Sequence, residues 1–335
     1  MGVQRVIGIA VLLIAGRSRV AAAEEMVRPG EVWRDTAGQV IQAHGGGILR
    51  VGAEWYWFGE DRTPVVAAGL DPAKRYVSCY RSHDLVHWES RGRVLAISEP
   101  EDMKARFGGD WILERPKVFW VAKTRKYVMY FHADAAYKAA EVGVAMSDKV
   151  DGPYTFVKHF RPLGQESRDI GQFVDDDGAN YLIFESRPTK GFFIARLAED
   201  GMDVSETAFV KAPIEGGALV RYEGMYYVIG SHMTGWKPNP NVYATAKTLT
   251  GPWSEFKELA PGSPDTWGSQ SSMLVKVTGS KRTTVIYVGD LWKPKELWDS
   301  RYGWMPVEIG GGAMQVPKPQ VWGVDVGTGV APLVR

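Results

Sequence analysis

The strongest constraint on the fold is a strand–turn–strand unit that occurs five times along the chain. Each copy has a short apolar run, a polar turn and a second run rich in aromatic residues, as expected of a β-hairpin. The copies are HGGGILRVGAEWYWFGE, ERPKVFWVAKTRKYVMYFH, DIGQFVDDDGANYLIFES, EGGALVRYEGMYYVIGS and QSSMLVKVTGSKRTTVIYVGD, and they begin about 45 to 70 residues apart. Self-similarity at such a spacing indicates a repeat architecture.

The intervals between the copies hold further strand pairs, such as EVGVAMSDKVDGPYTFVKHF and NVYATAKTLTGPWSEFKEL. Two hairpins make a four-stranded blade, and radial repetition of blades limits exposed strand edges. We therefore predict an all-β fold, a five-bladed β-propeller, over residues 24–335. EPEDMKARFG is one short helical candidate. A β-sandwich is the competing fold, but it does not predict so regular a unit.

One position of the unit is polar in every copy. Four residues before the first apolar strand position stand His44, Glu114, Asp169, Glu215 and Gln270. Equivalent positions in a radial array converge, so we expect these side chains at the axial mouth of the propeller. Three are carboxylates, and acids that face one another need a ligand or a chemical role to hold them there. The alternative is that they cap strand ends by bonding to backbone amides.

A second acidic group, Asp175 to Asp177 before Gly178, looks like a calcium loop. It aligns with the turns KTRK, YEGM and TGSK of other copies, and Asp and Gly are common in tight turns. The other ligand spacings of a calcium loop are missing. We expect a solvated turn, and no metal or cofactor.

The amino-acid composition limits the kinds of molecule that the protein is expected to bind. The 40 basic and 39 acidic residues nearly cancel, which argues against nucleic-acid binding, because phosphate contacts need net or clustered positive charge. Many of the 13 Trp and 14 Tyr stand among polar residues, as platforms that stack on sugar rings would. Core and strand packing must nevertheless account for most of them.

The first residues predict export. Arg5 precedes an apolar run from Val6 to Ala15 and then small residues that end at Ala23, a pattern typical of a secretory signal peptide over residues 1–23. The apolar run is too short to span a bilayer. We expect a secreted or periplasmic monomer with no membrane contact once the leader is removed.

Converging carboxylates suit the hydrolysis of a glycosidic bond. The reaction needs an acid that protonates the leaving oxygen and usually a second group that activates water. A third carboxylate raises the pKa of the acid through like-charge repulsion. Glu114, Asp169 and Glu215 supply that number, and the expected substrate is an oligo- or polysaccharide.

Eight motifs occur in order between about Trp33 and Trp322: QAHGGGIL, WFGED, ERPKV, RPLGQESRDIGQFVDDDG, TGWKPNP, GPW, WGSQSS and DSRYGWMPV. Together they resemble glycoside hydrolase family 43, and most closely its exo-β-1,3-galactanase subgroup. The resemblance implies an inverting exo-hydrolase that releases galactose from β-1,3-galactan. It also implies a general acid at Glu215 and a pKa-modulating, orienting aspartate at Asp169. The subgroup's contacts to the terminal galactose match Glu60, Glu114 and Tyr137.

The resemblance departs from the wider family at His44, where most members have an aspartate as general base. The subgroup shares this loss and uses a glutamine, which falls on Gln270 and would position water. We expect His44 to bind substrate or to have a structural role. An inverting site needs its two groups roughly 6.5 to 9.5 Å apart, a gap that opposite sides of a propeller funnel can provide.

Two residues outside the repeated position are further candidate sugar contacts. Trp236 in TGWKPNP is a sugar platform or a loop anchor. Arg301 contacts sugar or forms a salt bridge with Asp290 or Asp299 that holds the last blade. The sequence EGGA at Glu215 lacks a proline that relatives carry after the glutamate, which predicts a looser loop around the acid.

Other functions fit the same features. A β-galactofuranosidase or an α-L-arabinofuranosidase of this fold would differ only in its loops. A non-catalytic carbohydrate-binding propeller would keep the aromatic residues, but it has no use for Glu215 set against Asp169.

Overall fold

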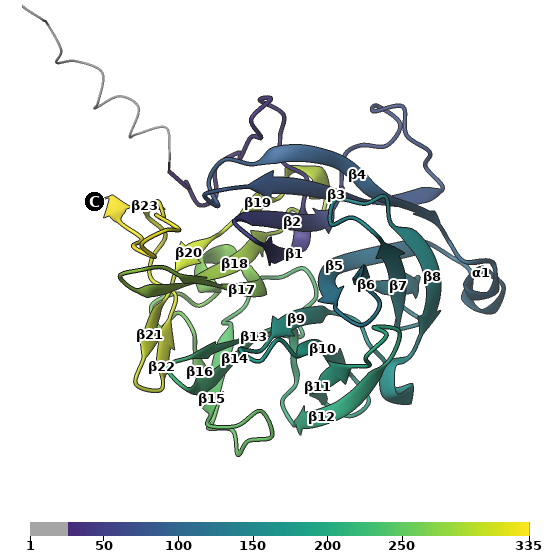
Figure 1. Ribbon diagram of the computed structural model, residues 1–335. Helices are drawn as coiled ribbons and strands as arrows, with labels where there is room; N and C mark the ends of the chain where they lie inside the picture. The colour runs from purple at the N-terminus through teal and green to yellow at the C-terminus, as the bar shows by residue number, and fades with distance from the viewer. Residues whose placement is uncertain (1–25, 335) are drawn as a thin grey trace, which may run out of the picture.

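The computed structural model describes residues 26–334, and the expected leader, residues 1–23, lies outside them. The described chain forms five antiparallel sheets arranged around a central axis (Figure 1). The predicted all-β, five-bladed β-propeller is therefore confirmed.

The first four blades are each a meander of four strands that pair in sequence order. The first blade contains β1 (His44–Val51), β2 (Glu54–Glu60), β3 (Lys74–Ser82) and β4 (Glu89–Ser98). The second contains β5 (Trp111–Val121), β6 (Lys126–Ala135), β7 (Glu141–Ser147) and β8 (Thr155–Phe160). The third contains β9 (Ile170–Val174), β10 (Asn180–Ser186), β11 (Gly191–Leu197) and β12 (Val204–Val210). The fourth contains β13 (Ile214–Tyr222), β14 (Met225–His232), β15 (Val242–Ala246) and β16 (Lys257–Glu258).

The fifth blade is less regular. It contains β17 (Gln270–Thr278) and β18 (Thr283–Leu291), and β18 also pairs with β19 (Arg301–Tyr302) and β20 (Met305–Pro306). Two small hairpins follow, β21 (Glu308–Gly310) with β22 (Ala313–Gln315) and β23 (Val321–Trp322) with β24 (Leu333–Val334).

The five sequence copies form the first hairpin of each blade, and their first strands lie nearest the axis (Figure 1). The strand β13 packs against both β9 and β17, and β1 packs against β5. The turn between β9 and β10 holds the acidic group. There the Gly178 amide donates to the Asp175 carbonyl at 2.9 Å, and the Asp175 carboxylate accepts from the Tyr226 hydroxyl at 2.7 Å. The predicted turn is confirmed.

Aromatic side chains join the first blade to the last. Trp57, Trp88, Trp304 and Trp322 are at most 1 % exposed, and the rings of Trp57 and Trp304 lie 4.5 Å apart. The two ends of the described chain meet here, because Val27 and Trp322 exchange backbone hydrogen bonds of 2.7 and 3.1 Å. Core packing thus accounts for these tryptophans, as expected for most of the aromatic residues.

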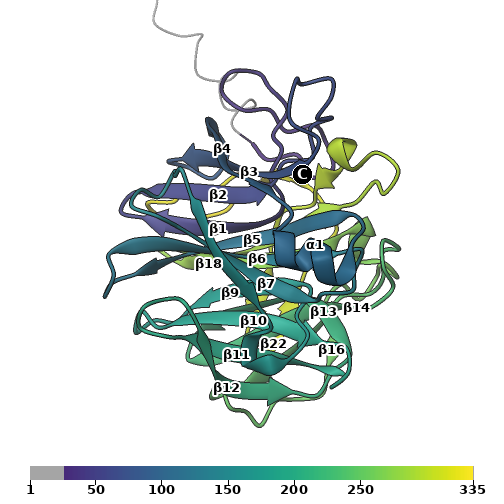
Figure 2. The same ribbon diagram turned by 90° about the vertical axis from the view of Figure 1, so that its right-hand side faces the viewer.

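Helices contribute little to the fold. The expected helix is present as α1 (Glu101–Phe107), which buries Met103 and lies beside the second blade (Figure 2). Three short 3-10 segments occur at η2 (Pro162–Gly164), η3 (Thr266–Gly268) and η4 (Leu297–Asp299). Within residues 26–334, the helices are all too short or too polar to cross a membrane.

Candidate active site

A cavity of about 310 Å³ opens at the axial mouth, where the first strands of the blades begin. The sequence-predicted residues that line it are Glu60, Glu114, Tyr137, Asp169, Glu215, Trp236 and Gln270. Arg115, Arg187, Gly235 and Trp292 line it as well, although the sequence analysis did not single them out. The repeated polar position therefore converges as expected, with the exception of His44.

The local backbone explains how these side chains come to point into the mouth. In four blades the strand register shifts just after the repeated polar position, which marks a β-bulge. Bulges re-aim side chains and are frequent beside active sites. In three blades the next residue, Gly45, Arg115 or Gly216, has a φ of 57°, 53° or 63°. Glycine adopts this left-handed conformation at little cost, whereas Arg115 adopts it under strain.

Arg115 is the centre of the charge network. Its guanidinium lies 2.8 Å from the Asp169 carboxylate and donates to Gln270 Oε1 at 2.6 Å and to the Ser271 carbonyl at 2.9 Å. Its backbone N–H donates to Glu60 Oε1 at 2.9 Å. The side chain is buried, so these bonds are formed in a medium that strengthens them. Arg115 thereby fixes two of the three expected catalytic side chains relative to each other.

Glu215 has the properties of a proton donor. It is 6 % exposed, and its burial, reinforced by the negative charge of Asp169, raises its pKa to about 8. A carboxyl group with such a pKa is largely protonated at neutral pH, as a general acid must be. Its Oε1 accepts from the Gln270 amide at 3.2 Å. The role expected for Asp169 is thus electrostatically sound.

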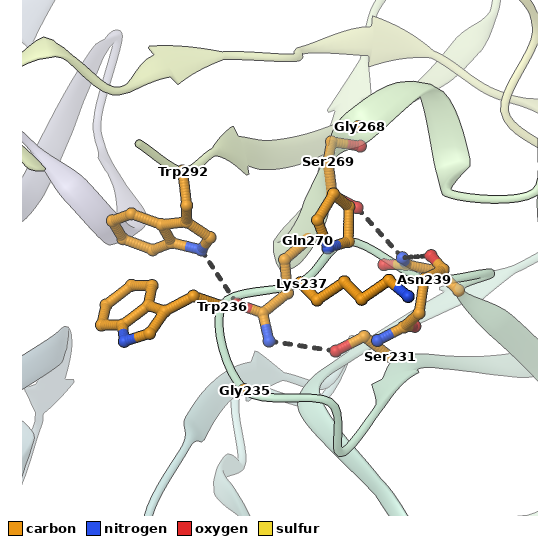
Figure 3. A pocket seen from close by; sticks show the side chains of 11 residues that line it. Ser231, Gly235, Trp236, Lys237, Asn239, Gly268, Ser269, Gln270 and Trp292 are labelled. Carbon is orange, nitrogen blue, oxygen red and sulfur yellow. Dashed lines mark hydrogen bonds between the residues drawn. The ribbon is translucent and has the colours of Figure 1, made fainter. Parts of the chain in front are cut away.

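The amide of Gln270 is held by four partners. Its oxygen accepts from Arg115 at 2.6 Å and from the Trp292 indole at 2.9 Å. Its nitrogen donates to Glu215 at 3.2 Å and to the Ser231 hydroxyl at 3.1 Å; Figure 3 shows the bonds to Trp292 and Ser231. A flipped amide would set N–H groups against two N–H donors, so this orientation is determined. The expected gap between Gln270 and Glu215 is absent here, because the two side chains are in direct contact.

Glu114, in the lining of the same cavity, is held as an anion. Burial alone would raise its pKa, but the hydrogen bond and positive charge of His132 lower it to about 2. His132 bridges Glu114 at 3.1 Å and Asp134 at 3.0 Å, and these two partners outweigh burial and raise the pKa of the imidazole to about 9. The Tyr137 hydroxyl donates to Glu114 at 3.0 Å, and Arg62 lies 3.2 Å from it. This oriented carboxylate can accept hydrogen bonds from sugar hydroxyls.

Two candidate sugar contacts do not line the cavity. His44 is fully buried; its ring stacks on Tyr302 at 5.0 Å, and its Nδ1 lies 3.4 Å from the Asp290 carboxylate. This burial excludes direct contact with a sugar in this conformation and favours the structural alternative. Arg301 donates to the carboxylate and carbonyl of Asp299, as the salt-bridge alternative expected, while Asp290 faces His44.

Trp236 stands at the rim of the cavity. Its side chain is 40 % exposed and meets the ring of Trp292 edge-on at 5.3 Å. Figure 3 shows both indoles beside Gln270. An exposed indole braced by a second one is suited to stacking on a sugar, although the same contact also anchors the loop.

A second polar position of the repeat was not recognised in the sequence, although two of its members, Glu60 and Asp290, were named for other reasons. The residues that end, or nearly end, the second strand of each hairpin are Glu60, His132, Glu185, Ser231 and Asp290. All are buried, and Glu60 also lines the cavity. Four of them stand at the last position of the aligned copies and Glu185 one residue before it, so reading that end as well as the first position would have found them.

The EGGA segment is not a loose loop. Glu215 lies inside β13, and a Cβ added to Gly216 would come within 2.8 Å of the Ser271 carbonyl. A Cβ added to Gly171 would come within 2.0 Å of the Gly217 carbonyl. The expectation of a looser loop is wrong, because the glycines allow two neighbouring strands to approach closely.

Comparison with known proteins relates this site to a family. The model of glycosyl hydrolases family 43 matches residues 46–279. An exo-β-1,3-galactanase of Phanerochaete chrysosporium, solved with β-1,3-galactotriose, is 39 % identical, with a TM-score of 0.83 over 92 % of this chain and 71 % of that one. An exo-β-1,3-galactanase of Clostridium thermocellum is 32 % identical, with a TM-score of 0.81 over 92 % of this chain and 68 % of that one.

Similarity to curated relatives is more local. A β-D-galactofuranosidase of Aspergillus niger is 32 % identical over 141 residues, which are 38 % of this chain and 39 % of that protein. A xylosidase/arabinosidase of Humicola insolens is 43 % identical over 63 residues, 18 % of this chain and 19 % of that protein. The chain thus matches less than half the length of these two relatives.

Proposed function

The chain belongs to glycosyl hydrolases family 43, and on that premise we propose that it is an exo-acting β-1,3-galactanase that releases galactose with inversion. The observation that carries the proposal is the buried Glu215, whose pKa is raised to about 8 by burial and by Asp169. Beside it, Gln270 lines the same cavity, and its amide donates to Glu215 at 3.2 Å. The two solved galactanases named above, similar over 92 % of the chain, support the substrate.

The proposed reaction uses Glu215 as the acid. Its Oε1 already accepts an N–H from Gln270, so the proton resides on Oε2 and passes from there to the glycosidic oxygen. The C1–O bond breaks, water attacks C1 from the opposite face, and the leaving sugar carries away the proton of Glu215. The attacking water keeps one proton as the new C1 hydroxyl and releases the other to solvent, from which the Glu215 carboxylate is reprotonated. Glu60, Glu114 and Tyr137 hold the terminal galactose.

Water handling needs a rearrangement of Gln270. All four of its hydrogen-bonding positions are occupied by protein groups. Bound sugar must therefore displace one partner before the amide can hold water, and Glu215 is the natural one, because it turns toward the glycosidic oxygen. This displacement also opens the gap that inversion requires.

A second candidate function is β-galactofuranosidase. It is favoured by the similarity to the Aspergillus niger enzyme over 141 residues. The same acid and the same aspartate would serve, and only the shape of the sugar pocket would differ.

A substrate panel tests the proposal. Purified protein is incubated with β-1,3-galactan, aryl β-galactopyranoside, aryl β-galactofuranoside and aryl α-L-arabinofuranoside, with Glu215→Gln as the control for contaminating activity. We expect galactose from β-1,3-galactan, with α-galactose as the first anomer by NMR. Early β-galactose would exclude inversion, and preferential cleavage of the galactofuranoside would select the second candidate.

We also propose that the protein is exported, loses residues 1–23 and acts as a monomer. The apolar run and the small residues before Glu24 motivate the first part. Mass spectrometry of protein from the native cell should find a chain that begins near Glu24; an intact cytosolic form would refute export. Analytical ultracentrifugation should find one chain per particle.

A further inference from the structure

Arg187 is a positively charged side chain in the cavity lining that is available to bind a ligand. It follows β10 in the turn to β11, lines the cavity and has a side chain that is 49 % exposed. Its guanidinium lies 3.6 Å from Glu215 Oε2 and 3.9 Å from Glu185 Oε1. Both distances exceed those of a hydrogen bond. Among the residues that the structure describes, its side-chain N–H groups thus have nearby charges but no hydrogen-bond acceptor.

The position of Arg187 identifies the part of the substrate that it meets. Glu215 Oε1 faces Gln270, whereas Oε2 faces Arg187. In the proposed reaction Oε2 delivers its proton to the glycosidic oxygen, so the leaving sugar passes beside Oε2. Arg187 therefore lies at the leaving-group side of the site.

A guanidinium at this place opposes the proposed chemistry unless it has another partner. A positive charge close to Glu215 favours the ionised carboxylate, which cannot donate a proton. This unfavourable effect on the protonation of Glu215 disappears when an anion on the substrate draws the guanidinium away. Arg115, the other arginine in the lining, is already committed to Asp169 and Gln270.

The rest of the cavity disfavours an anionic substrate. Its carboxylates, from Glu60, Glu114 and Asp169, repel negative charge. A carboxylate on the substrate can be accommodated only where a local cation offsets this repulsion. The planar guanidinium of an arginine can do so, because it donates two parallel hydrogen bonds to a carboxylate.

We propose that Arg187 forms a subsite for a carboxylate on the leaving group, so that the enzyme prefers acidic galactan in which a uronic acid substituent lies next to the cleaved bond. The inference rests on the proposed function and adds a substrate class to it. Binding of the uronate turns Arg187 away from Glu215 and leaves the acid protonated for catalysis.

The test compares two β-1,3-galacto-oligosaccharides that differ only in a glucuronosyl substituent on the leaving sugar. The variants are Arg187→Gln and, as a matched control, Lys190→Gln, which removes an equal charge from the same turn but not from the cavity lining. We expect the wild type to favour the acidic substrate about tenfold in kcat/KM, the effect of one charge-assisted contact. Arg187→Gln should lose this preference, and Lys190→Gln should keep it.

A second readout separates the subsite from general stability. On the neutral substrate, Arg187→Gln should move the basic limb of the kcat profile to higher pH, because a cation near Glu215 is removed. The other charges that face Glu215, those of Asp169, Arg115 and Glu114, stay in place. Lys190→Gln should leave the limb where it is.

The outcomes distinguish the two proposals. Equal rates on both substrates, or equal loss of preference in both variants, overturn the uronate subsite and leave the galactanase proposal standing. If neither substrate is cleaved, the galactanase proposal fails. Calorimetric titration with the acidic oligosaccharide then still tests whether the subsite exists. The subsite requires that Arg187→Gln binds this oligosaccharide more weakly than Lys190→Gln does.

Discussion

Single residues in this site act through their neighbours. Glu215 is an effective acid because it is buried and faces Asp169, and Asp169 stays in place because Arg115 holds it at 2.8 Å. The same guanidinium sets the orientation of Gln270. Chemistry at one carboxyl group therefore depends on a strained arginine that touches three blades.

Glu215→Gln should remove most activity while galactose binding persists, because the amide keeps the shape of the side chain but has no acidic proton. General acid catalysis typically contributes about 10² to 10⁴ in rate. Steady-state kinetics on β-1,3-galactan and on an aryl galactoside with a good leaving group provide the measurement. The loss should be smaller on the aryl substrate, and near wild-type turnover of galactan would identify another residue as the acid.

Asp169→Asn should lower activity and shift the basic limb of the kcat profile to lower pH. The anion raises the pKa of Glu215, so its removal lets Glu215 ionise earlier, and Arg115, freed from Asp169, adds to this effect. The wild-type limb should lie near pH 8, since burial and Asp169 raise the pKa to about 8. An unmoved limb would leave Asp169 as a sugar ligand without an electrostatic role.

Gln270→Ala should impair catalysis, whereas His44→Ala should impair stability. Gln270→Ala should abolish hydrolysis with little loss of galactose affinity, because the amide is proposed to position water. His44→Ala should instead lower the free energy of unfolding, on the order of 2 kcal/mol, because it leaves a cavity beside Tyr302. Thermal unfolding and calorimetric binding separate the two. An active Gln270→Ala enzyme would rule out the water-positioning role.

At the scale of the elements, a β-bulge at the start of the first strand does the positioning in four of the five blades. It turns the repeated polar residue toward the axis, and in the fourth blade the left-handed Gly216 after it lets neighbouring strands approach. Strands thus supply Glu60, Glu114, Glu215 and Gln270, whereas connecting segments supply the other cavity residues, Tyr137, Arg187, Trp236 and Trp292 among them.

Gly216→Ala should be more harmful than Gly224→Ala, although both glycines have positive φ, 63° and 77°. The strained backbone alone costs about 1 kcal/mol in each case. At Gly216 the new methyl group also meets the Ser271 carbonyl at 2.8 Å, whereas nothing lies within 4 Å at Gly224. Gly216→Ala should therefore unfold at lower temperature and lose kcat. Similar melting and kinetics of the two variants would show that the close approach is unimportant.

At the scale of the whole molecule, the propeller is held closed by its ends. Val27 pairs with Trp322, whose indole donates to the Trp304 carbonyl at 2.7 Å. The tryptophan cluster around Trp57 joins the first and last blades. Since the cavity is shared by all the blades, its shape depends on this closure.

Trp322→Ala should destabilise the protein by about 3–5 kcal/mol, because a fully buried side chain is lost from the closure. Trp120→Ala is the matched control, since that side chain is 40 % exposed on β5. Chemical denaturation should show a large decrease for the first variant and a small one for the second. Equal effects would mean that the closure contributes no more than a surface contact.

The sequence alone determined the fold and, apart from His44, the repeated polar position that lines the site. Five aligned copies predicted the blades, and the shared polar position predicted that Glu114, Asp169, Glu215 and Gln270 converge, because equivalent positions of a radial repeat must meet at its axis. Only the tertiary structure decided which of these groups touch. It buried His44 against Asp290, paired Arg301 with Asp299 and brought Arg115 to Gln270 across blades. The contacts of His44 and Arg115 join residues far apart in the chain and depend on side-chain direction at bulges, which hydrophobic periodicity does not encode.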